Sequence, residues 1–516
     1  MNAILQVSLL IVVLVSTCSG ETKTEWQERA QAELKAALKV VPNVNVAKNA
    51  ILFIGDGMGL PSVTAGRILK AQETNQRGQQ PLFSFEKFPS LGLSKTYNND
   101  RQTSDSASTG TAYLTGVKAN YGTIGVSPAV KRKDCAASKT EEGKLTSIHK
   151  WSLKEGKSVG FVTTARVTHA SPAAGYANSA DRNWEGTTEV PPECKDIAAQ
   201  LFDNVDFSVI MGGGRRYILM NNQTDPETNS VHSKQRTDGR DLIKEWKEKN
   251  MNAGKKTEYV YNKGQFDAVN PATTDSLLGL FAPSHMSYDL ERDKTDAGEP
   301  SLADMTRKAI QILKKNNKGF FLFVEGARID HGHHNNSAKR ALYDVLSLGD
   351  AVAAAVEETD EKDTLIVVSA DHSHVFGIAG YPSRENDIFG LVDIVPEDEK
   401  PFDKMPYTTL FYGNGPGIGR TNLTDVDTAD IDFQQPSMIQ MTDDTHGAED
   451  VAIYARGPMS HLFHGVHEEN YIAHVIGYAT CVGANKDHCS HSTSSSKRLV
   501  FSYPVVVFLI ALLLYK

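Results

Sequence analysis

The sequence contains few cysteines and no run of basic residues. Five cysteines occur in 516 residues, and their spacings do not resemble those of a zinc–thiolate cluster. The formal net charge of -9 and the lack of a basic run argue against nucleic acid as a partner. No repeat or long low-complexity segment is present, and 40% of the residues are hydrophobic. The chain can therefore bury a sizeable core.

Several motifs of other enzyme classes are absent. No C-x-P-x-R sequence, the nucleophile motif of sulfatases, occurs, and no G-x-S-x-G nucleophile elbow is present. The segment "GDGMGL" (55–60) has Leu60 where a dinucleotide fingerprint requires its last glycine. The tight turn "MGGGRR" (211–216) is only a weak indication of phosphate binding.

The N-terminus has the pattern of an export signal. Residues 1–20, "MNAILQVSLLIVVLVSTCSG", form an apolar run that ends in small residues, which predicts a signal peptide. Removal of Cys18 leaves an even number of cysteines, which favours disulfides in an exported protein: Cys135, Cys194, Cys481 and Cys489. Glycosylation sequons occur at Asn222, Asn335 and Asn422, and Asn335 is an awkward site because it directly follows a group of histidines.

The C-terminus resembles a glycosylphosphatidylinositol attachment signal. A polar tail (483–496) precedes an apolar segment (497–516), and the attachment residue is expected between Ser490 and Ser496. A membrane-spanning helix is the alternative, but the apolar run of 17 residues contains Pro504 and leaves only Lys516 beyond it. We therefore expect the mature protein on the outer face of the plasma membrane, reached through the secretory pathway.

Strand-like and helix-like patterns alternate along the chain. This alternation predicts an α/β fold with a central, mostly parallel sheet and helices on both faces. The predicted strands are 49–57, 157–165, 206–214, 319–326 and 363–374. The predicted helices are 301–316, 337–358 and 468–479. We expect one catalytic domain (45–482), an N-terminal helical arm (21–44) outside the core, and a Gly-, Pro- and Asp-rich insertion without sheet (about 383–446).

Acidic residues follow three of the predicted strands. The first strand is followed by Asp56, the fourth carries Glu325 at its end, and the fifth is followed by Asp371 and His372. A single carboxylate at a strand end usually caps the next helix. Several at one sheet edge would repel one another, and a bound cation is the usual remedy. The sequence therefore predicts a metal site at this edge.

The stretch "VEGARIDHGHH" adds further candidate ligands. Asp330 and His334 are four residues apart, so they lie on one face if a helix begins here. His331 and His333 point elsewhere on such a turn and are interpreted as structural, and His446 precedes a short predicted strand. A solvated loop is the alternative interpretation. Carboxylates and imidazoles without thiolates favour zinc in an exported enzyme.

Ser106 is the candidate nucleophile. It lies among small residues in "TSDSASTGTAYLTG" (103–116), just before a helical pattern. A serine at a helix N-terminus is close to unpaired N–H groups, which favour a phosphate bonded to it. From this segment alone, a plain helix cap is equally compatible with the pattern.

Together these segments resemble the animal alkaline phosphatases. The resemblance runs from about Asn45 to Cys481 and includes, in order, "GDGMG", "DSAST", "THASPA", "RNW", "VEGARIDHGHH", "ADHSH", "THGAEDV" and "ARGP". It implies a hydrolase of phosphate monoesters with a broad substrate range, which acts through a phosphoserine and uses two zinc ions and one magnesium ion. It also implies a homodimer contacted by the N-terminal helix, and a crown-like insertion.

The resemblance assigns roles to individual residues. Ser106 corresponds to the nucleophile, Arg182 to the arginine that clamps phosphate, and His169 lies near the magnesium site. One zinc would be held by Asp330, His334 and His446, and the second by Asp56, Asp371 and His372, with Ser106 also touching it. Magnesium would be held by Asp56, Ser171 and Glu325. The implied disulfides pair Cys135 with Cys194 and Cys481 with Cys489.

Two positions depart from the family pattern. Thr103 stands where a Val or Ile usually begins the nucleophile motif, but it is also β-branched. A calcium site found in mammalian members would map to Glu227, the Phe281 carbonyl and Glu299, but the acid expected after Phe281 is Ala282 here. Rival interpretations are a related sulfatase or phosphodiesterase, or a non-catalytic membrane-tethered binding ectodomain.

Overall fold

The computed structural model describes residues 21–76, 78–79 and 81–491. The predicted signal peptide and the apolar C-terminal segment lie outside these residues, as does most of the predicted attachment region. Within the described part of the chain, every helix is too short or too polar to span a bilayer. The chain divides into two compact units, Met1–Pro42 and Asn43–Lys516.

The described part of the first unit contains one helix, α1 (Lys23–Ala37). Thr22 accepts a hydrogen bond from the Glu25 N–H, and the Glu25 carboxylate accepts one from the Thr22 N–H, which forms a capping box. No residue of α1 is buried. The helix predicted from the sequence is present, and its contact with a second subunit stays a prediction.

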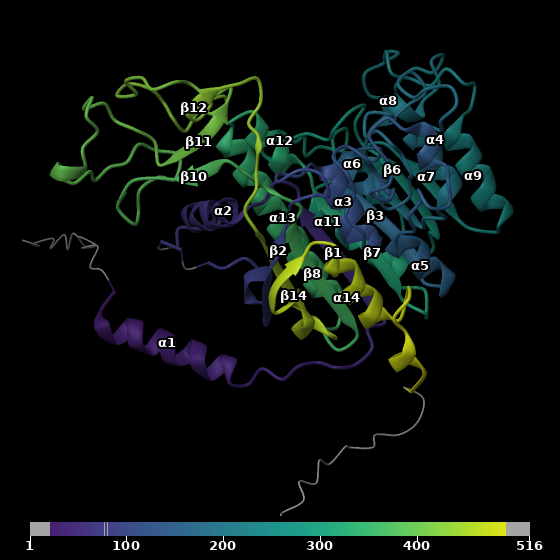
Figure 1. Cartoon of the computed structure of the whole chain (residues 1–516), viewed down its shortest axis with the longest axis horizontal. Helices are drawn as coiled ribbons and strands as arrows, with labels where there is room; N and C mark the ends of the chain where they lie inside the picture. Colours follow the sequence, from purple (N-terminus) through teal and green to yellow (C-terminus); the bar gives the residue numbers. More distant parts are fainter. Residues whose placement is uncertain (1–20, 77, 80, 492–516) are drawn as a thin grey trace, which may run out of the picture. The chain divides into compact units, whose positions relative to one another are not determined.

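A ten-stranded sheet forms the centre of the second unit (Figure 1). Its order is β15-β2-β14-β8-β1-β7-β3-β4-β6-β5, and β14 is its one antiparallel strand. The strands, in the order of the sheet, are Gly465–Glu468, Ser90–Lys95, Val451–Arg456, Thr364–Ala370, Asn49–Gly55, Phe320–Gly326, Ser158–Arg166, Val209–Gly213, Ser276–Leu280 and Thr257–Val260. The predicted mostly parallel sheet is confirmed.

Helices cover both faces of the sheet because its central strands are apolar on both sides. In β1, Leu52 and Ile54 belong to one core cluster, whereas Ile51 and Phe53 belong to the other. The first cluster includes residues of α3 (Ser106–Thr115), α5 (Ile148–Lys154), α6 (Ala170–Ala173), α7 (Ile197–Asn204), α8 (Arg215–Ile218), α9 (Leu242–Asn252) and α14 (Tyr471–Thr480). The second includes residues of α2 (Leu60–Glu73), α10 (Lys263–Ala268), α11 (Leu302–Leu313), α12 (Arg328–His334) and α13 (Ala338–Glu358).

The remaining short elements lie in loops around this core. They are α4 (Cys135–Ser138), η1 (Phe85–Lys87), η2 (Asp289–Glu291), η3 (Glu397–Glu399), η4 (Ser460–Phe463) and η5 (Asp487–His491). A two-stranded ladder of β9 (Ser373–His374) and β13 (His446–Gly447) pairs His374 with His446. This ladder brings the segment after β8 to the segment before β14.

The insertion contains a sheet, so its predicted lack of strands is wrong. β11 (Leu410–Gly415) pairs with β10 (Phe376–Ile378) and, in parallel, with β12 (Ser437–Gln440) (Figure 1, upper left). Leu410 and Tyr412 are buried against α2 and α13 residues such as Leu69 and Leu342. Burial of one face of β11 stabilises these short strands despite their Gly- and Pro-rich surroundings.

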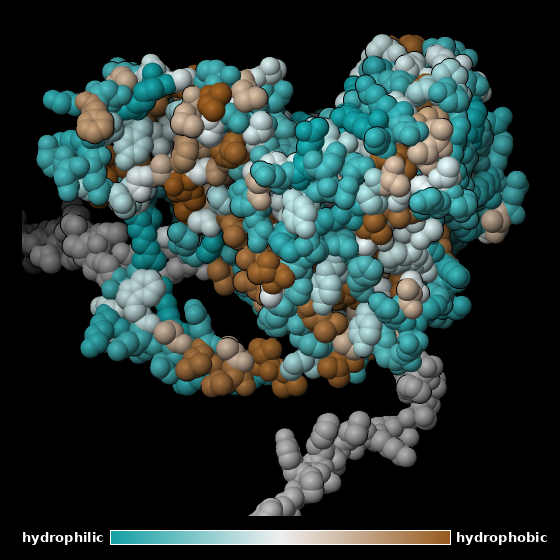
Figure 2. Space-filling model, in the orientation of Figure 1, coloured by the Kyte–Doolittle hydropathy of each residue, from teal (hydrophilic) through white to brown (hydrophobic). Residues whose placement is uncertain are grey.

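The insertion also exposes several large apolar side chains. They include Ile394, Phe402, Met438, Ile439 and Met441. Figure 2 shows hydrophobic residues, in brown, scattered among hydrophilic ones over this part of the molecule.

Candidate active site

The predicted acidic residues meet at the carboxyl edge of the central strands. Gly55 of β1 pairs with Gly326 of β7 and with Ala370 of β8, so Asp56 and Asp371 leave the sheet at the same level. Glu325 pairs with Ile54, one residue before the end of β1. All three acids are fully buried. The sheet register, rather than the sequence spacing, brings them together.

Gly57 makes the turn after Asp56 possible. Its N–H donates to Asp371 Oδ1 over 2.9 Å, and its φ of +70° lies in the left-handed region. A Cβ at this position would come within 2.6 Å of His374 Nε2. A larger residue would therefore displace the side chains around Asp371 and His374.

Ser106 is the first residue of α3 and faces these acids. Asp105 caps the helix and accepts a hydrogen bond from the Ser108 N–H. The Ser106 Oγ lies 3.4 Å from Asp56 Oδ1 and 3.3 Å from His372 Nε2. Ser106 is 2% exposed, so the hydroxyl lies in a largely dry environment beside these two ionisable groups.

Asp330, His334 and His446 form a first candidate cation site. The Nε2 atoms of His334 and His446 lie 3.3 and 3.5 Å from Asp330 Oδ1 and 3.2 Å from each other. Each ring donates from Nδ1 to a backbone carbonyl, His334 to Asp444 over 2.6 Å and His446 to Ser104 over 2.8 Å. Each Nε2 therefore keeps its lone pair, as a metal ligand requires.

His372 forms a second candidate site with Asp56 and Asp371. Its Nε2 lies 3.5 Å from Asp56 Oδ1 and 3.1 Å from Asp371 Oδ2, while its Nδ1 lies 3.3 Å from the Ser373 carbonyl. This arrangement also leaves the lone pair on Nε2. The Ser106 hydroxyl contacts the same nitrogen, so a cation here would touch the candidate nucleophile.

A third candidate site lies between β1, β3 and β7. Ligand atoms of Asp56, His169 and Glu325 lie within 4.8 Å of one another. Four buried polar atoms find no hydrogen-bond partner among the described residues: Asp56 Oδ2, Glu325 Oε1, Ser171 Oγ and His169 Nδ1. Native proteins rarely leave so many buried polar atoms unpaired, which indicates a missing ligand.

Burial makes the ionised form of most of these carboxylates unfavourable. Burial, then the charges of Asp371, Asp330 and Glu325, raises the pKa of Asp56 well above its usual range. Burial likewise raises the pKa of Glu325 to about 7 and raises that of Asp371. Burial also opposes the charge of Asp330, but His334 and other imidazoles hold its pKa well below its usual range. Divalent cations would relieve this repulsion.

The donor types fit the expected ions. The first two sites offer imidazole and carboxylate, which suit zinc, and the third offers mainly oxygen, which suits magnesium. The unpartnered buried atoms and the fixed tautomers are the observations behind this fit. Among the described residues, the group Cys481, His488 and Cys489 does not compete, because its sulfurs form a disulfide.

Arg182 lies beside α3, and two contacts fix the position of its guanidinium group. Its Nη1 donates to Asp105 Oδ2 over 3.0 Å, and its Nη2 lies 3.4 Å from His169 Nε2. Burial disfavours its charge, but Asp105, Asp56 and Asp330 outweigh burial and raise the pKa of Arg182. The guanidinium therefore stays charged and oriented.

Two residues of the site, His374 and Asp444, were not predicted from the sequence. His374 donates to Asp330 Oδ1 over 2.8 Å and to Asp444 Oδ2 over 2.7 Å. Burial opposes protonation, but the two carboxylates raise the pKa of His374 to about 9. Both ring nitrogens of His374 contact a carboxylate, so the ring positions Asp330. Its place two residues after His372, on the same side of an extended segment, was the available signal.

The predicted calcium ligands are only partly free for a cation. The buried Arg215 guanidinium contacts Glu227 and also pairs with Asp225 over 2.9 and 3.0 Å. Glu299 accepts a hydrogen bond from the Ser287 N–H over 2.9 Å, and burial raises its pKa to about 7. Phe281 is buried and directly follows the last residue of β6. Calcium binding here stays a prediction.

The four cysteines form the two expected disulfides, Cys135–Cys194 and Cys481–Cys489. All three sequon asparagines are exposed. Asn335 donates from Nδ2 to the His331 carbonyl over 2.9 Å, so the nitrogen to which a glycan would be attached already makes a hydrogen bond. Glycosylation itself stays a prediction.

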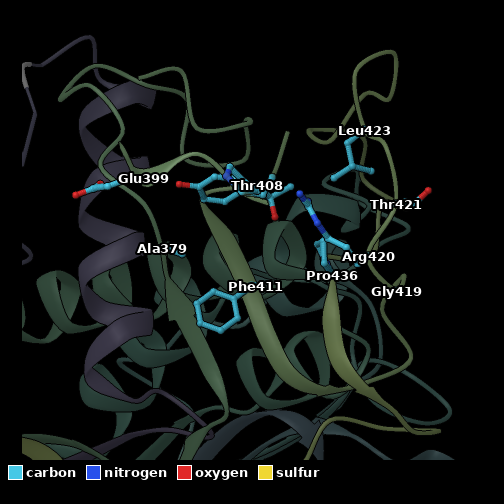
Figure 3. A pocket seen from close by; sticks show the side chains of 11 residues that line it. Ala379, Glu399, Thr408, Phe411, Gly419, Arg420, Thr421, Leu423 and Pro436 are labelled. Atoms are coloured by element: carbon cyan, nitrogen blue, oxygen red, sulfur yellow. The ribbon is translucent and has the colours of Figure 1, made fainter. Parts of the chain in front are cut away.

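A separate pocket of about 390 Å³ lies in the insertion (Figure 3). It is lined mainly by apolar surface that includes Phe411, Leu423 and Pro436. Its one arginine, Arg420, is bound to Asp403 over 2.7 and 2.9 Å and to two backbone carbonyls. None of the predicted site residues lines this pocket, so it is not the reaction centre.

Comparisons with known proteins agree with this geometry. The profile of the family "Alkaline phosphatase" matches residues 47–482. The rat tissue-nonspecific alkaline phosphatase is 50% identical over 508 residues, which cover 94% of this chain and 95% of the relative. An alkaline phosphatase of Gadus morhua is 48% identical over 475 residues, which cover 89% and 98%.

Solved structures share the fold. The alkaline phosphatase of Thermus thermophilus has a TM-score of 0.63 at 23% identity and covers 88% of this chain and 96% of its own. The enzyme of the Antarctic bacterium TAB5 has a TM-score of 0.58 at 22% identity, with coverages of 86% and 100%. These likenesses, with the family profile and the half-identical relatives, lead to one conclusion: the chain belongs to the alkaline phosphatase family.

Proposed function

We propose that the chain hydrolyses phosphate monoesters through a phosphoserine at Ser106. The observation that carries the proposal is the position of the Ser106 hydroxyl at the N-terminus of α3, 3.4 Å from Asp56 and 3.3 Å from His372. The uncatalysed hydrolysis of phosphate monoesters is very slow, and enzymes accelerate it by up to roughly 10²¹-fold. One positioned acid or base contributes only about 10²- to 10⁴-fold. The buried acids and imidazoles therefore serve as cation ligands.

In the first step, Ser106 Oγ forms a bond to phosphorus while the ester P–O bond breaks. The Ser106 hydroxyl loses its proton and the departing ester oxygen gains one, so the product leaves as the alcohol and the phosphoryl group is now bonded to Ser106. Arg182 donates from its planar guanidinium to two phosphoryl oxygens, and Asp105 holds that guanidinium in place through Nη1. The N–H groups at the start of α3 add further favourable charge.

In the second step, a water oxygen forms a bond to phosphorus while the P–Oγ bond breaks. Ser106 recovers its hydroxyl, and inorganic phosphate remains against Arg182. Bound divalent cations would supply charge stabilisation and a lowered pKa for the oxygen that attacks in each step. Because the transition-state charge lies mainly on the phosphoryl oxygens, the contacts to the alcohol matter little, which supports a broad substrate range.

Two zinc ions and one magnesium ion per chain fit these residues. One zinc would be held by Asp330, His334 and His446, and the other by Asp56, Asp371 and His372. Magnesium would be held by Asp56, Ser171 and Glu325, with His169 beside it. A weaker calcium site at Glu227, the Phe281 carbonyl and Glu299 forms part of the proposal, although Ala282 contributes no carboxylate there.

The rival functions have less support. A sulfatase needs a nucleophile motif that the sequence lacks, and the third cation site argues against a simple phosphodiesterase. A non-catalytic ectodomain would be expected to lose the nucleophile or a ligand, whereas Ser106 and each acid are present and buried. The family assignment likewise favours the monoester hydrolase.

The proposed location is the outer face of the plasma membrane, with a glycosylphosphatidylinositol anchor. The polar tail and apolar end of the sequence support it. The test is treatment of membranes with phosphatidylinositol-specific phospholipase, which should release the activity. We also propose a homodimer, supported by helix α1, which buries none of its residues within this chain.

The experiment is a rapid acid quench of purified protein with an aryl phosphate, followed by peptide mass spectrometry and metal analysis of the same sample. Phosphate on Ser106 in the wild type, and none with Ser106→Ala, is the expected result. Ser108→Ala is the matched control, because Ser108 lies two residues further along the same helix with its hydroxyl bound to Asp105. Full turnover by Ser106→Ala would refute the nucleophile assignment.

A further inference from the structure

A second histidine cluster lies beside Arg182. It consists of His169, His285 and His331, and one ring nitrogen of each lies within 4.8 Å of the others. The His285 and His331 rings are 4.2 Å apart between centroids, and both side chains are half-buried. A small solute can therefore reach this cluster, and neither His285 nor His331 has a role in the proposed function.

Each ring of the cluster receives a hydrogen bond from a different arginine. Arg166 Nη1 donates to His285 Nε2, Arg182 Nη2 donates to His169 Nε2 over 3.4 Å, and Arg328 Nη1 donates to His331 Nδ1 over 3.0 Å. A guanidinium can only donate, so the accepting nitrogen carries no proton. The proton of each neutral ring is therefore on the other nitrogen.

These rings differ from those at the candidate zinc sites in whether a lone pair is left free for a cation. There, backbone carbonyls take the Nδ1 proton of His334 and His446, which frees the lone pair of Nε2 for a cation. In the second cluster, the arginines occupy the lone pairs and leave N–H donors free at His285 Nδ1 and His331 Nε2. Donors beside guanidinium groups attract an anion rather than a metal ion.

The charge balance of the cluster agrees with an anion. Arg166 is neutralised by Glu185, with contacts of 2.6 and 2.8 Å. Arg328 makes no ion pair with any described residue, and its guanidinium lies 3.7 Å from the centre of the Tyr288 ring. Arg328 Nε and His285 Nδ1 are both buried and lack a hydrogen-bond partner among the described residues. Unpaired buried donors of this kind indicate a ligand with acceptor oxygens.

We propose that His285, His331 and Arg328 form a subsite for a second oxyanion, a carboxylate or phosphate carried by the leaving group of the substrate. The subsite rests on the proposed function, in which Arg182 holds the reacting phosphoryl group. His169 connects the two, because it contacts Arg182 and its ring centroid lies 5.3 Å from that of His285. The subsite thus selects phosphate esters with a neighbouring negative charge.

The test compares two esters that differ only in charge, 3-carboxyphenyl phosphate and 3-carbamoylphenyl phosphate. We measure the ratio of their kcat/KM values with the metal-loaded full chain and with His285→Ala. The ratio should favour the carboxylate in the wild type and fall about tenfold in the variant, as expected for a lost hydrogen bond to a charged group. His285→Asn keeps an N–H donor and should recover part of the ratio.

His467→Ala is the matched control, because His467 is also half-buried but stacks on Tyr471, 4.3 Å away between ring centres. The same ratio in His285→Ala and wild type, with both esters hydrolysed, would overturn the subsite alone. Hydrolysis of neither ester by the wild type would instead overturn the proposed function. Loss of one bound zinc in His285→Ala would show a metal site and refute the proposal. Weaker inhibition by free benzoate without a change of ratio would also refute it, because the site would then bind free anions.

Discussion

The partner of one imidazole nitrogen decides what the other nitrogen binds. At His334 and His446 the partner is a carbonyl oxygen, at His374 it is a carboxylate on each side, and at His331 it is a guanidinium. The same residue type therefore serves as a cation ligand, a charged positioning group or an anion donor. Each role follows from an acceptor or donor that lies outside the ring itself.

Arg182→Lys is predicted to lower kcat/KM for an aryl phosphate about 10- to 100-fold. An ammonium group cannot hold two phosphoryl oxygens and Asp105 in one plane, so about one charge-assisted hydrogen bond is lost. Steady-state kinetics and the inhibition constant of inorganic phosphate measure the effect. Arg132→Lys is the control, because Arg132 pairs with Asp181 over 3.1 Å in the same part of the fold. Equal losses in both variants would contradict a role in phosphate binding.

His374→Ala is predicted to weaken zinc binding about 10- to 100-fold, since residues that orient metal ligands typically contribute this much. Without the imidazolium, Asp330 loses a 2.8 Å hydrogen bond and buried Asp444 loses its counter-charge. Competition with a zinc-sensitive chelator measures the affinity. His461→Ala, outside the site, should bind zinc as the wild type does. Unchanged affinity in His374→Ala would remove the positioning role.

At the residue scale, the sequence predicts ligands that share one local pattern. Asp330 and His334 are recognisable because a helix places residues four apart on one face, and the structure holds them 3.3 Å apart. His374 and Asp444 are not recognisable in this way, because they meet across a ladder between segments 70 residues apart. Likewise, no local pattern links Arg166 to His285 or Arg182 to His169, which are 119 and 13 residues apart in the sequence.

At the scale of elements, apolar runs and strand ends were the reliable signals. The predicted strands 49–57 and 319–326 appear as β1 and β7, and the register between them sets the level of Asp56 and Glu325. The insertion shows the opposite case. β11 is short and depends on packing against α2 and α13, and β12 pairs with β11, which a local pattern does not reveal.

Helix α13 contains an acid that should make stability depend on pH. Burial, with the charge of Asp289, raises the pKa of Asp344 to about 8, against an ordinary value of 3.8. A carboxyl whose pKa is raised on folding stabilises the fold below about pH 4, and this contribution is lost as pH rises to about 8. Ionised Asp344 therefore destabilises the native state under alkaline conditions.

Asp344→Asn is predicted to raise the free energy of unfolding by about 2 kcal/mol at pH 8, because the amide never ionises. The difference in the free energy of unfolding between Asp344→Asn and the wild type should increase from pH 5 to pH 8 and then become constant. Thermal or urea unfolding across this range measures it. Asp350→Asn, on the same helix but at an exposed position, should show a smaller difference from the wild type. A gap that does not vary with pH would contradict the raised pKa.

For the whole molecule, the cations should contribute to stability as well as to catalysis. Asp56, Glu325, Asp330 and Asp371 are buried at one sheet edge, and their mutual repulsion is tolerable only with counter-charge. A cation at 100 times its Kd stabilises the native state by about 2.7 kcal/mol. Chelation should therefore abolish turnover and lower Tm, with recovery on addition of zinc and magnesium together.

The pH dependence of the chelated protein provides the sharper measurement. Without cations, the raised pKa values of Asp56, Asp371 and Glu325 mean that folding favours their protonated forms. This stability is present at low pH and is lost as pH rises through the raised values, so the chelated protein should unfold more easily from pH 5 towards pH 8. The metal-loaded protein should show a much flatter profile, because the cations keep these acids ionised in the fold. Two parallel profiles would mean that the acids do not face a common cation site, whereas convergence of the two proteins at acidic pH would follow directly from competition between protons and metal ions for the same oxygens.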